Sequence, residues 1–247
     1  MGLKEIAYRA AHRAPLSDFV AVLSRFSDVP ELARPSRAPR HPMVVSVTID
    51  TEGGYVGEDE SRIWQGAAPD AFEGYVHGIP NLLDVLERYG AKATFLVSPH
   101  GLSSKGATFA AVEGALARIV AGGHEIGLHL HPASDRAIHV KVGRTFDETS
   151  ARYLSRQDKE DAVRAGRDLL AAATPADLVS FRWGNWGLDE DGARVVADAG
   201  FRIDSSAVPG LRDRKVLRRP RFDWSAHSSH EPWTIAPGLQ EIPIATF

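Results

Sequence analysis

Residues 125–132 read EIGLHLHP, a strand-like segment in which aliphatic residues alternate with glycine and histidine. Successive side chains of an extended chain point to opposite faces, so the aliphatic residues share one face and His129 and His131 share the other. The two histidines stand at the end of the strand, just before Pro132, which marks the start of a loop. Two imidazoles at positions i and i+2 form a compact pair of metal ligands, although two hydrogen-bonded histidines in a polar pocket would give the same pattern.

Strand-like and helix-like segments alternate on both sides of this strand. The other strand-like segments are MVVSVTID (43–50), AKATFLVS (91–98), LVSFRW (178–183), FRIDSS (201–206) and LQEIPIA (239–245). Apolar spacing and capping residues predict helices from Ile79 to before Gly90, around Val112–Ile119 before Gly122, from Ser155 to about Ala173, and after Asp189. Repeated strand–helix units predict a parallel α/β architecture, either a barrel or an open sheet.

The composition narrows the chemistry that the chain can support. None of its 247 residues is cysteine, which excludes disulfides, thiolate catalysis and cysteine-bound zinc, so any metal must be held by His, Asp and Glu. The formal net charge of −3 gives no global basic field of the kind that binds nucleic acid. No apolar run approaches the roughly 18 residues of a membrane-spanning helix, and the N-terminus has no secretory apolar core. We expect a cytoplasmic protein.

Two regions differ in character. Residues 1–42 combine two short helical patterns with the Pro- and Arg-rich stretch ELARPSRAPRHP, which predicts an N-terminal helical arm and a linker. Residues 43–247 carry the strand–helix units and are expected to form one domain.

Two carboxylates follow the first strand-like segment. Asp50 ends that segment on the face opposite its aliphatic residues, and Glu52 shares this face if the chain stays extended. Catalytic groups of parallel α/β barrels gather at the carboxyl ends of the strands, so we expect these carboxylates beside His129 and His131. Two nitrogens and one carboxylate oxygen suit zinc or another first-row divalent ion with positions left for water.

Arg182 ends another predicted strand within SFRWGNWG. An arginine there can be an ordinary solvated or ion-paired residue, or it can orient a catalytic carboxylate and keep it ionised. Trp183 and Trp186 suit core packing, but aromatic faces at a cleft also suit sugar rings, so both are candidate substrate contacts.

Other features are less informative. His100 follows the second strand and could line the pocket, and the basic run at 212–221 could be a solvated loop or could attract an anionic glycan. The sequence contains neither a Gly-rich phosphate loop nor a GxSxG nucleophile elbow, so it gives no support for nucleotide-dependent or serine-hydrolase chemistry.

Taken together, the strand-end segments resemble the polysaccharide deacetylase family, the NodB-homology domain of carbohydrate esterase family 4. The resemblance extends from about Val44 to Ile244. It rests on five segments in the family's order, TID (48–50), GAKATFLVS (90–98), GHEIGLHLHP (123–132), FRWGNWG (181–187) and GFRIDSS (200–206). The resemblance implies a distorted (β/α) barrel, a divalent metal that is often zinc, and hydrolysis of N-acetyl groups on amino sugars.

The resemblance also implies roles for individual residues. Asp50 matches the family's general base, Arg182 matches the residue that holds this base, and His129 matches the first histidine ligand.

Three positions depart from the family's pattern. Thr51 stands where the family has a metal-binding Asp, and Glu52 is the expected substitute. Ala133 stands where the second histidine falls, and His131, which precedes a proline, is the expected replacement. The family's last motif, a Leu-x-His that supplies a general acid, would lie beyond Phe247, so the acid is not assigned.

We therefore expect a metal-dependent hydrolase of non-peptide C–N amide bonds, which removes N-acetyl groups from amino sugars of a polysaccharide or glycoconjugate. Three alternatives remain at this point: a deformylase of a lipid-linked aminosugar, a metal-free amidase of the same fold, and a non-catalytic carbohydrate-binding protein.

Overall fold

The computed structural model describes residues 45–53, 72–103, 106–213 and 219–245. The predicted N-terminal arm at 1–42 lies outside these residues. The strands are β1 (Thr48–Thr51), β2 (Thr94–Val97), β3 (Glu125–Leu130), β4 (Ser180–Trp183), β5 (Ile203–Asp204), β6 (Trp233–Ala236) and β7 (Leu239–Glu241). The α-helices are α3 (Ile79–Arg88), α4 (Gly106–Ala121), α5 (Arg136–Val142), α6 (Arg156–Ala173) and α7 (Glu190–Asp198). Short helical turns span Gly74–Gly78, Pro99–Ser103, Ala151–Tyr153 and Gly184–Trp186.

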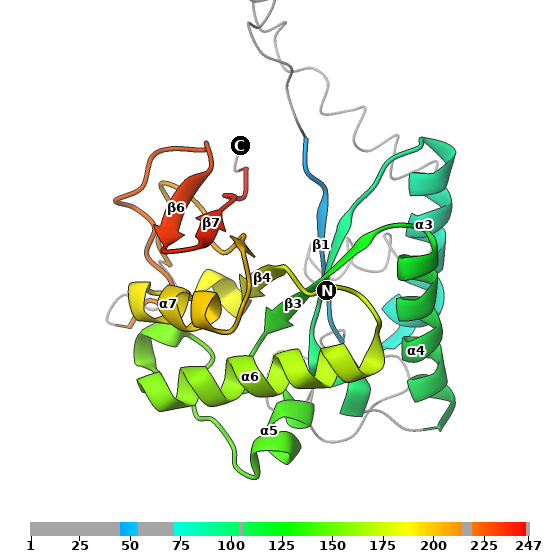
Figure 1. Ribbon diagram of the computed structural model, residues 1–247, viewed down its shortest axis with the longest axis horizontal. Helices are drawn as coiled ribbons and strands as arrows, with labels where there is room; N and C mark the ends of the chain where they lie inside the picture. Colours follow the sequence, from blue (N-terminus) through cyan, green and yellow to red (C-terminus); the bar gives the residue numbers. More distant parts are fainter. Residues whose placement is uncertain (1–44, 54–71, 104–105, 214–218, 246–247) are drawn as a thin grey trace, which may run out of the picture. The chain divides into compact units, whose positions relative to one another are not determined.

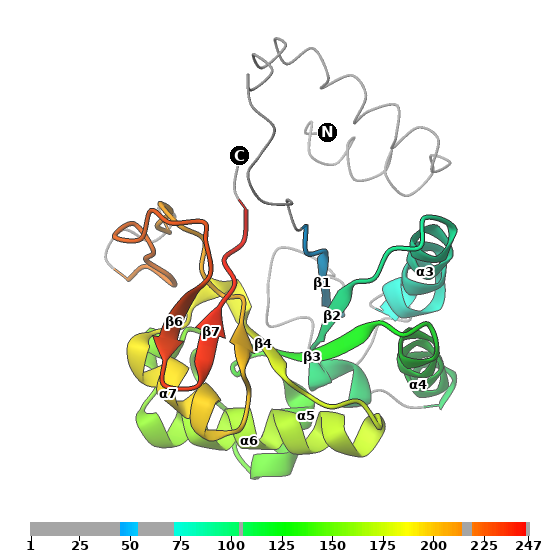
Figure 2. The ribbon, with the colours of Figure 1, turned by 45° about the horizontal axis from the view of Figure 1, so that its top comes forward.

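The strands form one mostly parallel sheet in the order β1-β2-β3-β4-β5-β7-β6, in which only the β6–β7 pair is antiparallel. The predicted α/β class is therefore confirmed. Within the described residues β1 and β6 are the two edges of the sheet, so the barrel that the resemblance implies is not closed there. The helices lie along the outer side of the curved sheet, with α3 and α4 beside the β1–β3 half and α7 beside β6 and β7 (Figure 1, Figure 2).

Side-chain alternation separates an apolar outer face of the sheet from a polar inner face. The outward side chains of the central strands are fully or almost fully buried against the helices: Phe95, Val97, Ile126, Leu128, Leu130, Phe181 and Trp183. On the inner face Glu125 accepts hydrogen bonds of 2.6 Å from both Thr94 Oγ1 and Ser180 Oγ, which ties β2, β3 and β4 together. Position 127 of β3 requires glycine, because a Cβ there would come within 2.7 Å of the Ser180 carbonyl oxygen on the neighbouring strand β4.

Local signals place the helix ends as predicted. At the start of α6, Ser155 and Asp158 form a reciprocal capping box. The Asp189 side chain accepts from the Gly192 amide and caps α7. The strand predictions are less accurate: β1 begins at Thr48 rather than near residue 43, and β6 was not predicted. The helix α5 was not predicted either.

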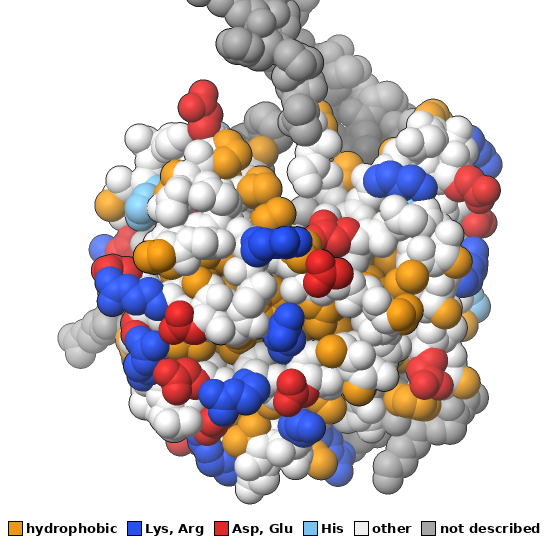
Figure 3. Space-filling model, viewed as in Figure 1, with side chains coloured by type: hydrophobic (Ala, Val, Ile, Leu, Met, Phe, Trp, Pro, Cys, Tyr) orange, Lys and Arg blue, Asp and Glu red, His pale blue; other side chains and the backbone are white. Residues whose placement is uncertain are grey.

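None of the helices in the described part of the chain combines the length and apolar character needed to cross a bilayer. Figure 3 shows acidic and basic side chains interspersed over α6 and α7 on the face in view. Several of these pair with one another, as in the 2.8 Å contacts of Arg156 with Glu160 and Asp191.

Candidate functional site

Five of the predicted site residues converge at the carboxyl ends of three strands. Asp50 lies within β1 and Glu52 directly follows it, His129 and His131 lie at the end of β3, and Arg182 lies within β4. Because β1, β3 and β4 belong to one parallel sheet, their carboxyl ends reach the same edge. The register places His129 directly opposite Arg182.

Three of these residues point their ligand atoms at one another. Glu52 Oε2 lies 3.1 Å from His131 Nε2 and 3.6 Å from His129 Nε2, and the two Nε2 atoms are 3.0 Å apart. Among the described residues, Glu52, His129 and His131 are the three side chains of His, Cys, Asp or Glu type that lie close enough together to hold a metal ion. Thr51, which stands where the family has a metal-binding Asp, is buried, and its hydroxyl donates to the Ile49 carbonyl at 3.2 Å.

The hydrogen bonding of His129 prepares it to be a ligand. Its Nδ1 lies 3.1 Å from the carbonyl oxygen of Arg182, so Nδ1 carries the proton and the Nε2 lone pair faces the cluster. Burial, and then the neighbouring His131, lower the pKa of His129, which favours the neutral imidazole that binds metal. Gly184, which directly follows β4, packs on His131, and a Cβ there would come within 2.7 Å of the imidazole ring.

The carboxylate of Glu52 is held ionised in spite of its burial. Burial acts to raise its pKa, but the hydrogen bond to His131 and the positive charge that the nearby imidazoles carry when they are protonated outweigh burial and lower it. An ionised oxygen and two neutral nitrogens form the donor set that zinc prefers. With ligand bonds of about 2.0–2.2 Å, tetrahedral ligands stand about 3.3–3.6 Å apart, close to the observed separations. These residues therefore fit a divalent ion.

A second, charged pair stands beside this cluster. Arg182 Nη1 donates to Asp50 Oδ1 at 2.6 Å. The arginine side chain is only 5% exposed, whereas that of Asp50 is 36% exposed, so solvent reaches the carboxylate while the guanidinium is buried. The guanidinium also donates to Thr48 Oγ1 at 2.8 Å and to the carbonyl and hydroxyl oxygens of Ser205 at 2.7 and 2.9 Å.

The two predicted substrate contacts have different surroundings. Trp183 is fully buried, and its indole N–H donates to the Thr149 carbonyl at 2.6 Å. It packs in the core because β4 turns it to the helix side of the sheet, which corrects the expectation that it contacts substrate. Trp186 is 38% exposed and adopts a left-handed backbone with φ of 54°. This conformation is rare for a bulky residue, and it directs the ring outward beside Phe222.

Sequence reasoning missed several residues that support the site. The Tyr75 hydroxyl donates to the Thr51 carbonyl at 3.1 Å and so fixes the backbone between the two carboxylates. Buried Asp135 accepts from Ser98 Oγ and from the Ile138 amide, and burial raises its pKa to about 7. The pattern of Asp135 ahead of Arg136–Val142 is a helix-capping signal that could have been found.

His100 lies on the side of the site that the sequence predicted. Its side chain is buried and stacks on Phe72, and Glu52 acts on it electrostatically. Burial lowers the pKa of His100 to about 4, so the ring is neutral at pH 7.

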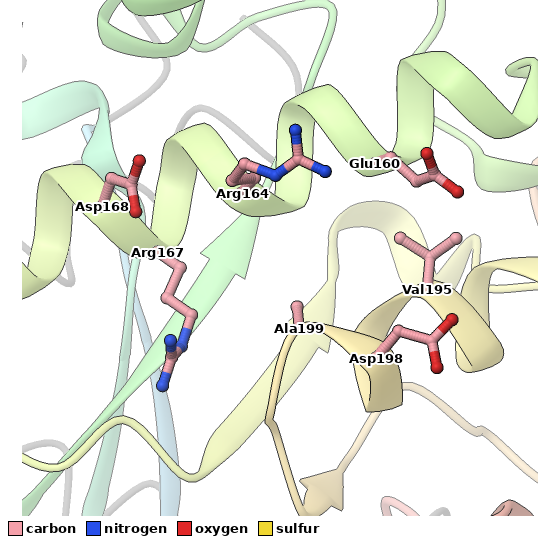
Figure 4. Close-up of a pocket in the computed structure, with 7 residues that line it drawn as sticks. All are labelled: Glu160, Arg164, Arg167, Asp168, Val195, Asp198 and Ala199. Atoms are coloured by element: carbon pink, nitrogen blue, oxygen red, sulfur yellow. The ribbon is translucent and has the colours of Figure 1, made fainter.

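A separate cavity of about 390 Å³ lies between α6 and the end of α7. Its lining residues are Glu160, Arg164, Arg167, Asp168, Val195, Asp198 and Ala199. In Figure 4 the two arginines point in different directions, and carboxylates surround them. This cavity therefore assembles no convergent set of groups, unlike the ends of the strands.

Comparisons with known proteins give the following matches. The family model described as polysaccharide deacetylase matches residues 72–203, which include both histidines and Arg182 but neither Asp50 nor Glu52. A search of curated proteins finds no match.

Among solved structures, one from Mycobacterium smegmatis, described as a candidate polysaccharide deacetylase, is 19% identical with a TM-score of 0.52. The match covers 81% of this chain and 58% of that protein, and it shows a shared fold. A family 4 carbohydrate esterase from Streptomyces lividans in complex with acetate is 13% identical (TM-score 0.39, covering 65% of this chain and 60% of that one). A CE4 family pseudoenzyme from Bacillus anthracis is 16% identical (TM-score 0.39, covering 63% and 40%).

Proposed function

Because the chain belongs to the polysaccharide deacetylase family, we propose that it is a metal-dependent hydrolase that removes N-acetyl groups from amino sugars of a polysaccharide or glycoconjugate. One observation carries the proposal. A three-residue ligand cluster of Glu52, His129 and His131 lies at the same sheet edge as a carboxylate held by a buried arginine.

The ligand cluster would hold the divalent ion, with zinc as the first choice for two imidazole nitrogens and one carboxylate oxygen. The chemistry that such an ion supplies is Lewis-acid polarisation of the amide carbonyl and activation of water. The chain's own contribution is to fix the ligands. His129 is held by the Arg182 carbonyl, and the backbone next to Glu52 is held by Tyr75.

Asp50 is the proposed general base. Its side chain is 36% exposed, so a water molecule that attacks the acetamide carbon can reach it and transfer a proton to it. Arg182 engages one oxygen of this carboxylate, which fixes the orientation of the group while the proton is transferred.

Trp186 is the proposed contact for a sugar ring. It ends the short helical turn Gly184–Trp186 that follows the carboxyl end of β4, and its exposed indole offers an apolar face to the C–H groups of a pyranose.

The test combines metal analysis with acetate release. We expect the purified protein to bind about one equivalent of zinc or another first-row divalent ion. His129→Ala and His131→Ala should lose that ion, whereas His77→Ala, an exposed histidine on a short helix, should keep it. Acetate release from N-acetylated oligosaccharides should follow the metal content, and Asp50→Asn should bind metal but release acetate at least about 100-fold more slowly.

Other outcomes would favour the alternatives. No metal after reconstitution, with amide hydrolysis retained, would contradict the metal site and favour a metal-free amidase. Glycan binding without acetate release would favour a carbohydrate-binding protein. Formate release from an N-formylated aminosugar in place of acetate would indicate a deformylase.

A further inference from the structure

Two carboxyl groups that the proposed reaction does not use lie buried next to each other behind Arg182. Asp204 on β5 and Glu241 on β7 are both 0% exposed. The register of these parallel strands places the two residues directly opposite each other. Two ionised carboxylates side by side in a protein interior repel each other and lack solvation, so such a pair retains one proton.

The hydrogen bonds show which carboxyl group carries the proton. Asp204 accepts from the Ser206 amide at 3.1 Å and from the Ser206 hydroxyl at 2.8 Å, as an ionised group does. Glu241 Oε1 accepts from the Ala207 amide at 3.0 Å, while Oε2 is buried and receives no donor from the described residues. An oxygen that accepts nothing is the natural position for a proton, and a hydrogen bond with the Glu241 side chain acts to lower the pKa of Asp204, as a protonated Glu241 would.

The charges around the pair agree with this assignment. Burial, followed by the charge of Asp204, raises the pKa of Glu241 to about 12. Burial also raises the pKa of Asp204, but Arg182 on the neighbouring strand β4 acts against that rise.

The same contacts connect the pair to the candidate site. Ser205 lies between Asp204 and Ser206, and its carbonyl and hydroxyl oxygens receive two of the hydrogen bonds of the Arg182 guanidinium. Ser206 Oγ in turn accepts from the Trp183 amide at 2.8 Å, which locks this turn onto β4. The position of the guanidinium therefore depends on a turn that the two carboxyl groups hold.

We propose that Glu241 is a positioning residue that, as a neutral acid, donates a hydrogen bond to ionised Asp204. The pair fixes the turn at 205–207 against Arg182, and the inference rests on the proposed function because that arginine holds the base.

Three variants test the proposal. In Glu241→Gln the amide keeps an acceptor for Ala207 and a donor for Asp204, so it reproduces the neutral acid. Glu241→Ala removes the donor, and Asp204→Asn places an N–H₂ group where the structure needs an acceptor. We expect the Ala and Asn variants to melt about 5–10 °C lower than the wild type at pH 7, and the Gln variant to melt at least as high as the wild type, because Glu241 ionises in the unfolded chain at this pH and Gln does not.

Activity separates positioning from a purely structural role. The Ala and Asn variants should lose about tenfold or more in kcat, with KM within about twofold, at temperatures where they remain folded. Glu241→Gln should restore kcat. At pH 9, where Asp135 with its pKa of about 7 is ionised, the infrared spectrum of the wild type should also show a protonated carboxylic acid band that is absent from Glu241→Gln.

Three results would overturn the proposal: a Gln variant that is as defective as the Ala variant, an Asn variant at 204 that behaves like the wild type, or no loss of the carboxylic acid band in Glu241→Gln. Failure of the proposed function is distinguishable. If the wild type releases no acetate from any N-acetylated oligosaccharide, the infrared and melting measurements still decide whether the pair exists.

Discussion

Replacing Arg182 with methionine should destabilise the protein far more than removing the charge of its partner, Asp50. The guanidinium is 5% exposed and makes four hydrogen bonds of 2.6–2.9 Å. Methionine fills much of the same space but leaves the Ser205 carbonyl without its donor and Asp50 without its counter-charge. An unsatisfied buried acceptor costs about 1–3 kcal/mol, so we expect Arg182→Met to lower the free energy of unfolding by about 2–4 kcal/mol.

Asp50, the other residue of this ion pair, should contribute less to stability because its side chain is more exposed. The Asp50 carboxylate is 36% exposed, so solvent screens its interaction, and Asp50→Asn should cost at most about 1 kcal/mol. The same substitution removes the proposed general base and should reduce kcat by about 10²–10⁴. We therefore expect Arg182→Met to have the larger effect on stability and Asp50→Asn to act mainly on activity.

Urea unfolding, monitored by tryptophan fluorescence, measures the free energy of unfolding of both variants and of the double variant. Equal m-values would show that the same surface is exposed on unfolding in each protein. The coupling energy between the two positions should be near 1 kcal/mol, well below the total effect of Arg182→Met. An Arg182→Met protein within about 0.5 kcal/mol of the wild type, or an Asp50→Asn protein that is equally destabilised, would refute the view that Ser205 and burial anchor the arginine.

Four further outcomes are expected. Removing the metal with a chelator should reversibly lower the free energy of unfolding, by about 2.7 kcal/mol if the free ion was present at 100 times its Kd, and with it the melting temperature. The melting temperature of His129→Ala should not change. Trp186→Gly should raise KM for the glycan several-fold at nearly constant stability, because relief of the left-handed backbone, about 1–2 kcal/mol, offsets the lost contact with Phe222. Glu241 has a folded-state pKa above its unfolded value, so its stabilising contribution is complete below pH 4.5 and declines as the pH rises. Stability of the wild type relative to Glu241→Gln should therefore fall by up to about 1.4 kcal/mol per pH unit between pH 6 and 9, which melting curves at each pH can measure. Finally, Ser155→Ala should cost about 1 kcal/mol in urea unfolding through loss of the capping box, with no effect on acetate release.

The predictions that the structure confirms rest on local signals. The capping box at Ser155 and the cap at Asp189 fix helix starts through contacts within one turn, so the sequence contains them whole. The apolar-polar alternation of residues 125–131 likewise predicts which face His129 occupies, because side-chain direction in a strand depends only on the parity of the position. Parallel pairing then brings the strand ends together without any knowledge of the loops.

The features that were missed depend on contacts between distant segments. Trp183 has the same residue type and neighbourhood as Trp186, and only the position of β4 within the sheet shows that one ring is buried and the other exposed. Among the residues that the structure describes, strand β6 pairs only with β7 at the edge of the sheet, and its sequence WTIA is too short to give a periodic signal.

The buried Asp204–Glu241 pair is the clearest example of a feature that the sequence alone does not predict. Each carboxylate taken alone predicts a solvated strand end, since aspartate and glutamate are rarely buried without a partner. Burial becomes possible only when the register of β5 against β7 makes them neighbours, 37 positions apart, and sharing one proton removes half of their charge. The exposed Asp50 carboxylate is bound by Arg182, Arg182 is bound by Ser205, and the turn that contains Ser205 is bound by the two buried carboxyl groups, so one continuous set of contacts runs from the surface to the core. The strand ends alone therefore predict the candidate site but not the contacts that support it, because those contacts come from the pairing of β5 with β7.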